Sequence, residues 1–90
     1  MEITEKVRLT NRLGLHLRAA AEFAKTSSKF KCRILVKSHR HQADGKSVIN
    51  LLALAATCGS ELTMTFRGDD AEDAYSAIQC LVQAKFGEKD

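Results

Sequence analysis

The sequence predicts an α+β fold in two layers, an open-faced sandwich in which a four-stranded antiparallel sheet carries three helices on one face. Three short stretches alternate between polar and apolar residues, which is typical of strands with one buried side, and a fourth, polar stretch is typical of an edge strand. Segments with apolar residues at helical spacing lie between and after them, in the order β-α-β-β-α-β-α. Strands and helices in this order separate into two layers when the sheet is antiparallel and the helices share one face.

The chain begins with a strand and a helix. Residues 2–9 alternate between polar and apolar side chains, which indicates a half-buried strand. A loop that contains Gly14 follows this strand. Residues 16–28 predict a helix, because apolar residues such as Ala20 and Ala24 repeat at helical spacing. Its small alanine side chains would allow this helix to lie close to a sheet.

Two strands and a short helix are expected next. Residues 31–37 alternate again, and residues 38–43 are polar, which is typical of a strand at the edge of a sheet. Ser47 is a typical N-cap, so a helix is expected over residues 48–56. This helix is apolar around most of its circumference, and a helix on the surface of so small a domain cannot bury every side. We therefore expect an exposed apolar patch there, which usually indicates a binding surface.

The last strand and the last helix complete the pattern. Residues 60–67 alternate, and residues 71–86 carry an apolar stripe at helical spacing. Asp70 and Asp73 are spaced like the two members of a capping box, so we expect Asp70 to cap the last helix. The length is typical of one domain, and residues 1–90 are interpreted as a single domain.

Composition and charge favour a cytoplasmic protein without membrane insertion. The longest apolar run, Leu51 to Ala56, is far too short to cross a bilayer, and the first residues do not resemble a signal peptide. Three widely spaced cysteines without a C-x-x-C motif predict free thiols, with Cys32 and Cys58 packed in the core. The net charge of +3 fits either a solvated face or a surface for acidic partners, and charge alone does not choose between them.

The segment Gly14-Leu15-His16-Leu17-Arg18 places a histidine where a helix begins without an ordinary cap. The first N–H groups of a helix have no intrahelical partner, and together with the helix dipole they attract anions. Ser, Thr, Asp or Asn usually covers them, but His16 occupies that place. A neutral imidazole can attack phosphorus, and the arginine fork suits phosphate oxygens. The pattern therefore predicts that His16 accepts a phosphoryl group and that Arg18 stabilises it; the alternative is an ordinary surface histidine.

Two motifs resemble those of the HPr family, the histidine-containing phosphocarriers of the phosphoenolpyruvate-dependent phosphotransferase system. Gly14-Leu15-His16-Leu17-Arg18-Ala19-Ala20 is similar to the family motif G-L-H-A-R-P-A, and Lys46-Ser47-Val48-Ile49 is similar to a second motif in which a serine starts the second helix. The resemblance implies an HPr-like sandwich that is a stoichiometric carrier rather than an enzyme and needs no cofactor. By this resemblance His16 takes the phosphoryl group from enzyme I at Nδ1 and passes it to an enzyme IIA domain, assisted by Arg18.

The resemblance also implies a docking surface and a regulatory position. Leu17, Val48, Ile49 and Leu52 would contact the protein partners, and we expect the carrier itself to be a monomer. Ser47 has two interpretations, a helix cap or a site of regulatory phosphorylation by a dedicated kinase and phosphorylase, as in some members of the family.

Two departures from the family motif leave its branch open. Ala19 stands where the family usually has proline, and Leu17 stands where it usually has a small residue. Both the sugar-transport branch and the nitrogen-regulatory branch fit the sequence. A divergent regulatory protein that acts only by protein–protein contact is the alternative function.

Other functions are less well supported by the residues. Nucleic-acid binding is not expected, because RNA-reading sheets of this type display aromatic side chains on their strands. The strands predicted here offer only Phe66, which falls on the inward face. A phosphatase would need an activated water, and no paired carboxylates or metal ligands are expected near His16. His39 and His41 would share a face of the third strand, but no third ligand is suitably spaced, so no metal site is expected.

Overall fold

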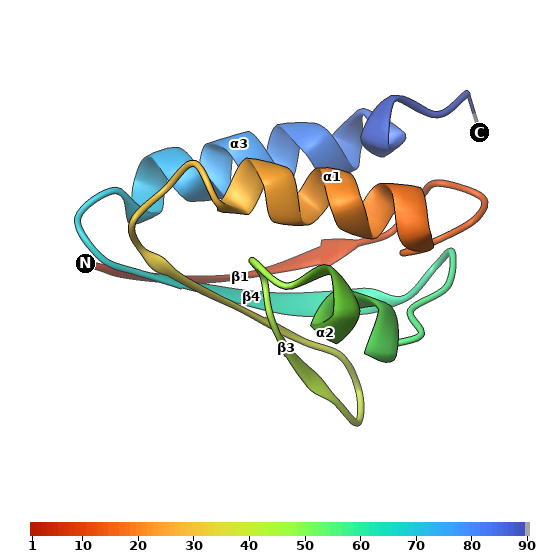
Figure 1. The fold of residues 1–90 in the computed structure, drawn as a ribbon, viewed down its shortest axis with the longest axis horizontal. Helices are drawn as coiled ribbons and strands as arrows, with labels where there is room; N and C mark the ends of the chain where they lie inside the picture. The colour runs from red at the N-terminus through yellow and green to blue at the C-terminus, as the bar shows by residue number, and fades with distance from the viewer. Residues whose placement is uncertain (90) are drawn as a thin grey trace.

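The computed structural model describes residues 1–89 and confirms the predicted fold class (Figure 1). Four strands pair in the order β1-β4-β2-β3, and every pairing is antiparallel. The helices cover one face of this sheet, where α1 and α3 lie side by side. In chain order the elements are β1 (Glu2–Arg8), α1 (Leu17–Ser27), β2 (Arg33–Lys37), β3 (Gln42–Asp44), α2 (Val48–Ala53), β4 (Glu61–Arg67), α3 (Ala71–Gln83) and the 3₁₀ helix η1 (Lys85–Gly87).

The core lies between the sheet and the helices because each strand buries alternate side chains. On β4 the buried residues are Leu62, Met64 and Phe66, as the alternation predicts. Ile34 and Val36 of β2 are buried opposite Phe66 and Met64 in the register. The helices close this layer with large, fully buried residues, which are Phe23, Leu51, Ile78 and Val82. Burial of this layer holds α1 and α2 against the sheet and so fixes the ends of both helices.

The predicted boundaries differ from the structure mainly where the chain turns. The third strand is restricted to Gln42–Asp44, and residues 38–41 form the turn between β2 and β3. The second helix ends at Ala53 rather than at residue 56. Ala55 follows in a left-handed conformation with φ 51°, which ends the helical hydrogen bonding.

The predicted cap at Asp70 is wrong, because the side chain is used elsewhere. Asp70 precedes α3 but makes no capping bond; its carboxylate accepts the N–H groups of Lys31 at 2.8 Å and Cys32 at 2.9 Å. These bonds join the start of α3 to the segment that enters β2. Cys32 is buried as expected, whereas Cys58 is exposed, so the expectation of core packing is wrong for Cys58.

The last helix is shorter than predicted, and the chain then bends back over α1. Helix α3 ends at Gln83, and Lys85, Phe86 and Gly87 have φ of 55°, 56° and 81°. Phe86 is buried in this turn and α1 contacts η1. The turn therefore brings the C-terminal residues toward the N-terminal end of α1.

Candidate functional site

The loop before α1 is fixed by a glycine that no other residue can replace without strain. Gly14 has φ +66°, and its N–H donates to the Asn11 carbonyl at 3.1 Å. A Cβ at this position would lie 2.6 Å from the Ala56 carbonyl oxygen, closer than any normal contact. The next residue, Leu15, is buried and donates its N–H to that same carbonyl at 2.9 Å. The loop is thus attached to the segment after α2, directly before His16.

His16 is the N-cap of α1, as the sequence predicts. Its backbone is extended, with φ −79° and ψ −178°, and its side chain makes no capping bond. Its carbonyl accepts the N–H of Ala20 at 2.8 Å, which is the first bond of the helix. Within residues 1–89, no hydrogen bond is donated by the backbone N–H groups of Leu17, Arg18 or Ala19. The first turn also contains no acidic side chain, so its donors are open to an anion.

The structure adds two residues to the site that the sequence did not indicate, Glu88 and Asn11. The Nε2 atom of His16 is hydrogen-bonded to Oε2 of Glu88. Oε1 of Glu88 accepts from Nδ2 of the buried Asn11 at 3.0 Å, and the same Nδ2 donates to the Gly14 carbonyl at 2.7 Å. Side-chain exposure is 27% for His16 and 12% for Glu88, so this contact is largely shielded from water.

The electrostatics of the site favour an ionised Glu88. Burial raises the pKa of Glu88, but hydrogen bonds from His16 and Asn11 and the nearby positive charge of Arg18 outweigh that effect. The net result is a pKa below the usual value for glutamate. The carboxylate therefore faces Nε2 of His16 as an anion, while Nδ1 makes no hydrogen bond to any residue in the described chain. One ring nitrogen is held by the protein, and the other is available for chemistry.

The residues expected to contact partners lie on α1 and α2, which pack against each other. Ile49 is 79% exposed and Leu17 is 64% exposed, unusually high values for large apolar side chains. Val48 and Leu52 are half-buried against the core and border this surface. Leu13, in the loop before His16, is also exposed, although it was not among the residues predicted to contact partners.

Ser47 and Arg18 occupy the positions that the sequence predicts. Ser47 is the N-cap of α2, and its Oγ accepts the N–H of Asn50 at 3.2 Å. Arg18 follows His16 by two residues in the first turn of α1, and its side chain is exposed. Its charge reaches Glu88, where it contributes to the lowered pKa.

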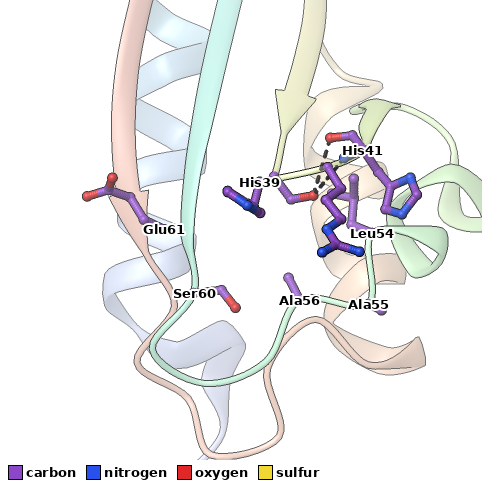
Figure 2. A pocket seen from close by; sticks show the side chains of 9 residues that line it. His39, His41, Leu54, Ala55, Ala56, Ser60 and Glu61 are labelled. Carbon is purple, nitrogen blue, oxygen red and sulfur yellow. Dashed lines mark hydrogen bonds between the residues drawn. The ribbon is translucent and has the colours of Figure 1, made fainter.

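A hollow of about 400 Å³ lies beside this site but does not include His16 (Figure 2). It is an open hollow, bordered by the turn between β2 and β3 and by the segment that leads from α2 into β4. His39 and His41 both line it, as does Glu61. Among residues 1–89 no three metal-binding side chains come together, here or elsewhere.

Comparison with known proteins identifies the family. A family model described as the PTS HPr component phosphorylation site matches residues 3–84. The chain belongs to the HPr family. "Phosphocarrier protein HPr" of Treponema pallidum is 38% identical over 97% of this chain and 99% of its own length. "Phosphocarrier protein NPr" of Shewanella violacea is also 38% identical, over 97% of this chain and 96% of its own.

Solved structures of the HPr family agree with the fold. The crystal structure of HPr from Thermoanaerobacter tengcongensis aligns with 100% of this chain and 99% of its own, with a TM-score of 0.90 and 34% identity. This HPr family member functions as a phosphocarrier in the phosphotransferase system, and a protein that acts only by contact is not favoured. Relatives named HPr and NPr are equally similar, so identity does not assign a branch. Within residues 1–89, no helix combines the length and the apolar character that crossing a bilayer requires.

Proposed function

We propose that His16 is the phosphoryl acceptor, taking the group from phosphorylated enzyme I and passing it to an enzyme IIA domain. The protein would act in the cytoplasm as a stoichiometric carrier with a phosphohistidine intermediate. The observation that carries this proposal is the position of His16 as the uncapped start of α1, with unpaired N–H groups in the turn that follows. A phosphoryl group on the ring would find donors that are not used elsewhere within residues 1–89.

The local chemistry fits transfer rather than hydrolysis. A neutral imidazole nitrogen is a nucleophile for phosphorus, and a phosphoramidate bond keeps the group reactive for the next acceptor. The negative charge of the bound group would be balanced by the N-terminal turn of α1 and by Arg18, whose fork can donate two hydrogen bonds to phosphate oxygens. Release to water would require an activated water, and the only carboxylate that contacts His16 in the described chain is Glu88, which already accepts two hydrogen bonds.

We propose that both partners dock over the exposed apolar residues that surround His16. Leu17 on α1 and Ile49 on α2 project from the surface, and Val48 and Leu52 form its half-buried border. An apolar surface beside a phosphoryl acceptor can exclude water from the transfer step while it binds the partner. One shared surface also explains how the carrier serves donor and acceptor in turn, since only one of them can contact His16 at a time.

The direct test is the intact mass of the protein after incubation with phosphoenolpyruvate and enzyme I. Wild type should gain one acid-labile phosphoryl group, and His16→Ala should gain none. His39→Ala is the matched control, because it also removes a histidine but lies in the turn between β2 and β3, outside the site. Phosphorylation of His16→Ala, or its loss in His39→Ala, would refute the assignment. Addition of an enzyme IIA domain should then return the carrier to its original mass.

Ser47 is proposed as a second, regulatory position. It caps α2 directly before Val48 and Ile49, so a phosphate there would place charge at the edge of the docking surface. Ser47→Asp should therefore weaken binding to enzyme I. Ser47→Asn is the control, because asparagine caps a helix as well as serine does without adding charge. Equal affinity of the two variants in a calorimetric titration would contradict the proposal.

A further inference from the structure

The C-terminal residues reach His16 only because the chain turns in an unfavourable way. Lys85 and Phe86 have left-handed backbone conformations, which residues other than glycine rarely adopt. The burial of Phe86 anchors the turn, and Glu88 then lies within hydrogen-bond reach of both His16 and Asn11. A strained turn that ends in a largely shielded hydrogen bond is evidence that the contact with His16 has a use, because nothing in the helix before it requires this path.

Asn11 fixes the orientation of the Glu88 carboxylate. It is fully buried, and its Nδ2 donates both to Gly14 and to Oε1 of Glu88, so the amide cannot rotate without losing two bonds. Oε2 of Glu88 is then directed to Nε2 of His16. Asn11, Glu88 and the ring form a chain of hydrogen bonds that runs from the loop before α1 to the C-terminal residues.

We propose that Glu88 is a positioning residue for phosphoryl transfer, which keeps the proton of His16 on Nε2 and leaves the lone pair of Nδ1 for phosphorus. This proposal rests on the function proposed for His16. An ionised carboxylate can only accept a hydrogen bond, so the neutral ring must present its N–H to Glu88. The other tautomer would place two acceptors in contact and would leave no lone pair on Nδ1. The hydrogen bond also fixes the direction in which the ring faces the partner.

The same carboxylate would support the phosphorylated state. When Nδ1 attacks, the Nδ1–P bond forms as the bond between phosphorus and the donor nitrogen of the partner's phosphohistidine breaks, and that bonding pair leaves with the donor. The proton on Nε2 stays in place, so the ring acquires a positive charge. Glu88 faces this charge at hydrogen-bond distance, in a site that is largely shielded from water. In the forward transfer to the acceptor the same steps run in reverse, and the ring returns to neutrality.

Glu88→Gln separates this role from simple packing. A carboxylate accepts from Asn11 and from His16 at once, whereas the amide of glutamine offers one acceptor and one donor. With Nδ2 of Asn11 held by Gly14, the glutamine oxygen would face Asn11, and its NH₂ group would face Nε2. The ring would then carry its proton on Nδ1. Glu5→Gln is the matched control, because it removes one negative charge from an exposed position on β1.

The experiment combines nitrogen NMR of the His16 ring with phosphorylation kinetics. In wild type and in Glu5→Gln, Nε2 should show the chemical shift of a protonated nitrogen and Nδ1 that of an unprotonated one. In Glu88→Gln these shifts should exchange, and the initial rate of phosphorylation by enzyme I should fall about tenfold or more, as for other residues that orient a histidine. Glu88→Ala provides a second variant that removes the contact altogether, and urea unfolding of each protein reports whether it is folded.

The outcomes distinguish the two proposals. An unchanged tautomer in both Glu88 variants, or a changed tautomer with an unchanged rate, would overturn the role of Glu88. A lower rate without any change in the ring would overturn it as well, since Glu88 would then act by another route. If wild type gains no phosphate at His16, the function proposed for His16 fails, and the ring spectrum still reports whether Glu88 holds it.

Discussion

Gly14→Ala should destabilise the fold and displace His16, and Gly59→Ala provides a control for it. Alanine at the φ of +66° found at Gly14 costs about 1–2 kcal/mol relative to its preferred backbone. Its Cβ would also lie 2.6 Å from the Ala56 oxygen and 2.7 Å from the Cα of Thr57, so backbone must move. Such overpacking typically costs about 1–3 kcal/mol. The expected total is therefore about 2–5 kcal/mol.

Gly59 has φ +92°, but a Cβ there would meet nothing within 4 Å. Gly59→Ala should cost only the backbone term of about 1–2 kcal/mol. The difference between the two variants in the free energy of unfolding, measured by urea titration with circular dichroism, isolates the contact with residues 56 and 57. Phosphorylation should also slow more in Gly14→Ala, because a small displacement of a reacting group strongly reduces the rate. Equal destabilisation by the two substitutions would refute the steric argument.

Three further variants test contacts around the site and the core. Asn11→Ala removes the buried bonds to Gly14 and Glu88 and should lower the free energy of unfolding by about 1–3 kcal/mol in a urea titration; no measurable loss would mean that these bonds contribute nothing. Ala19→Pro should fold, because the N–H of Ala19 has no partner in the described chain, but it removes one donor from the phosphoryl site. At a fixed ratio of phosphoenolpyruvate to pyruvate, we expect the equilibrium ratio of phosphorylated to unphosphorylated protein to fall about tenfold. An unchanged ratio of the two intact masses would exclude that donor. Hydrogen bonds from the N–H groups of Lys31, first, and of Cys32 lower the pKa of Asp70. Its contribution to stability is thus present above the pKa of the unfolded chain and is lost as the pH falls through the lower folded-state pKa. Wild type should accordingly have a higher free energy of unfolding than Asp70→Asn at neutral pH, and this difference should disappear as the pH falls below about 4. A difference that stays constant in urea titrations across that range would contradict the assignment.

The features that the sequence predicts well depend on residues near one another in the chain. Alternation along residues 60–67 identifies the buried side of β4, because a strand exposes and buries its side chains in turn. Ser47 is a cap because its hydroxyl needs only to reach Asn50, three residues away. His16 is recognisable for a similar local reason, since it stands where a cap belongs and cannot act as one.

The same reasoning fails for contacts between residues that are far apart in the sequence. Asp70 has the spacing of a capping residue, yet its carboxylate binds Lys31 and Cys32, thirty-eight and more positions earlier. A local pattern gives the preference of a side chain in isolation, and two well-placed donors from another segment outweigh a single capping bond. Asn11 shows the same limit, because its burial and its bond to Glu88 depend on where the C-terminal residues lie.

The placement of Glu88 is the hardest feature to predict because the terms that decide it nearly cancel. Left-handed backbones at Lys85 and Phe86 cost about 1–2 kcal/mol each, while Gly87 adopts φ 81° at little cost. Burial of the Phe86 side chain returns about 1.5–3 kcal/mol. Without Glu88, the backbone cost of the turn and the gain from burying Phe86 are thus nearly equal. The hydrogen bonds of Glu88 to His16 and Asn11 then determine whether Glu88 stays over the site. Sequence patterns do not resolve free-energy differences this small, so the contact of Glu88 with His16 is visible only in the folded chain.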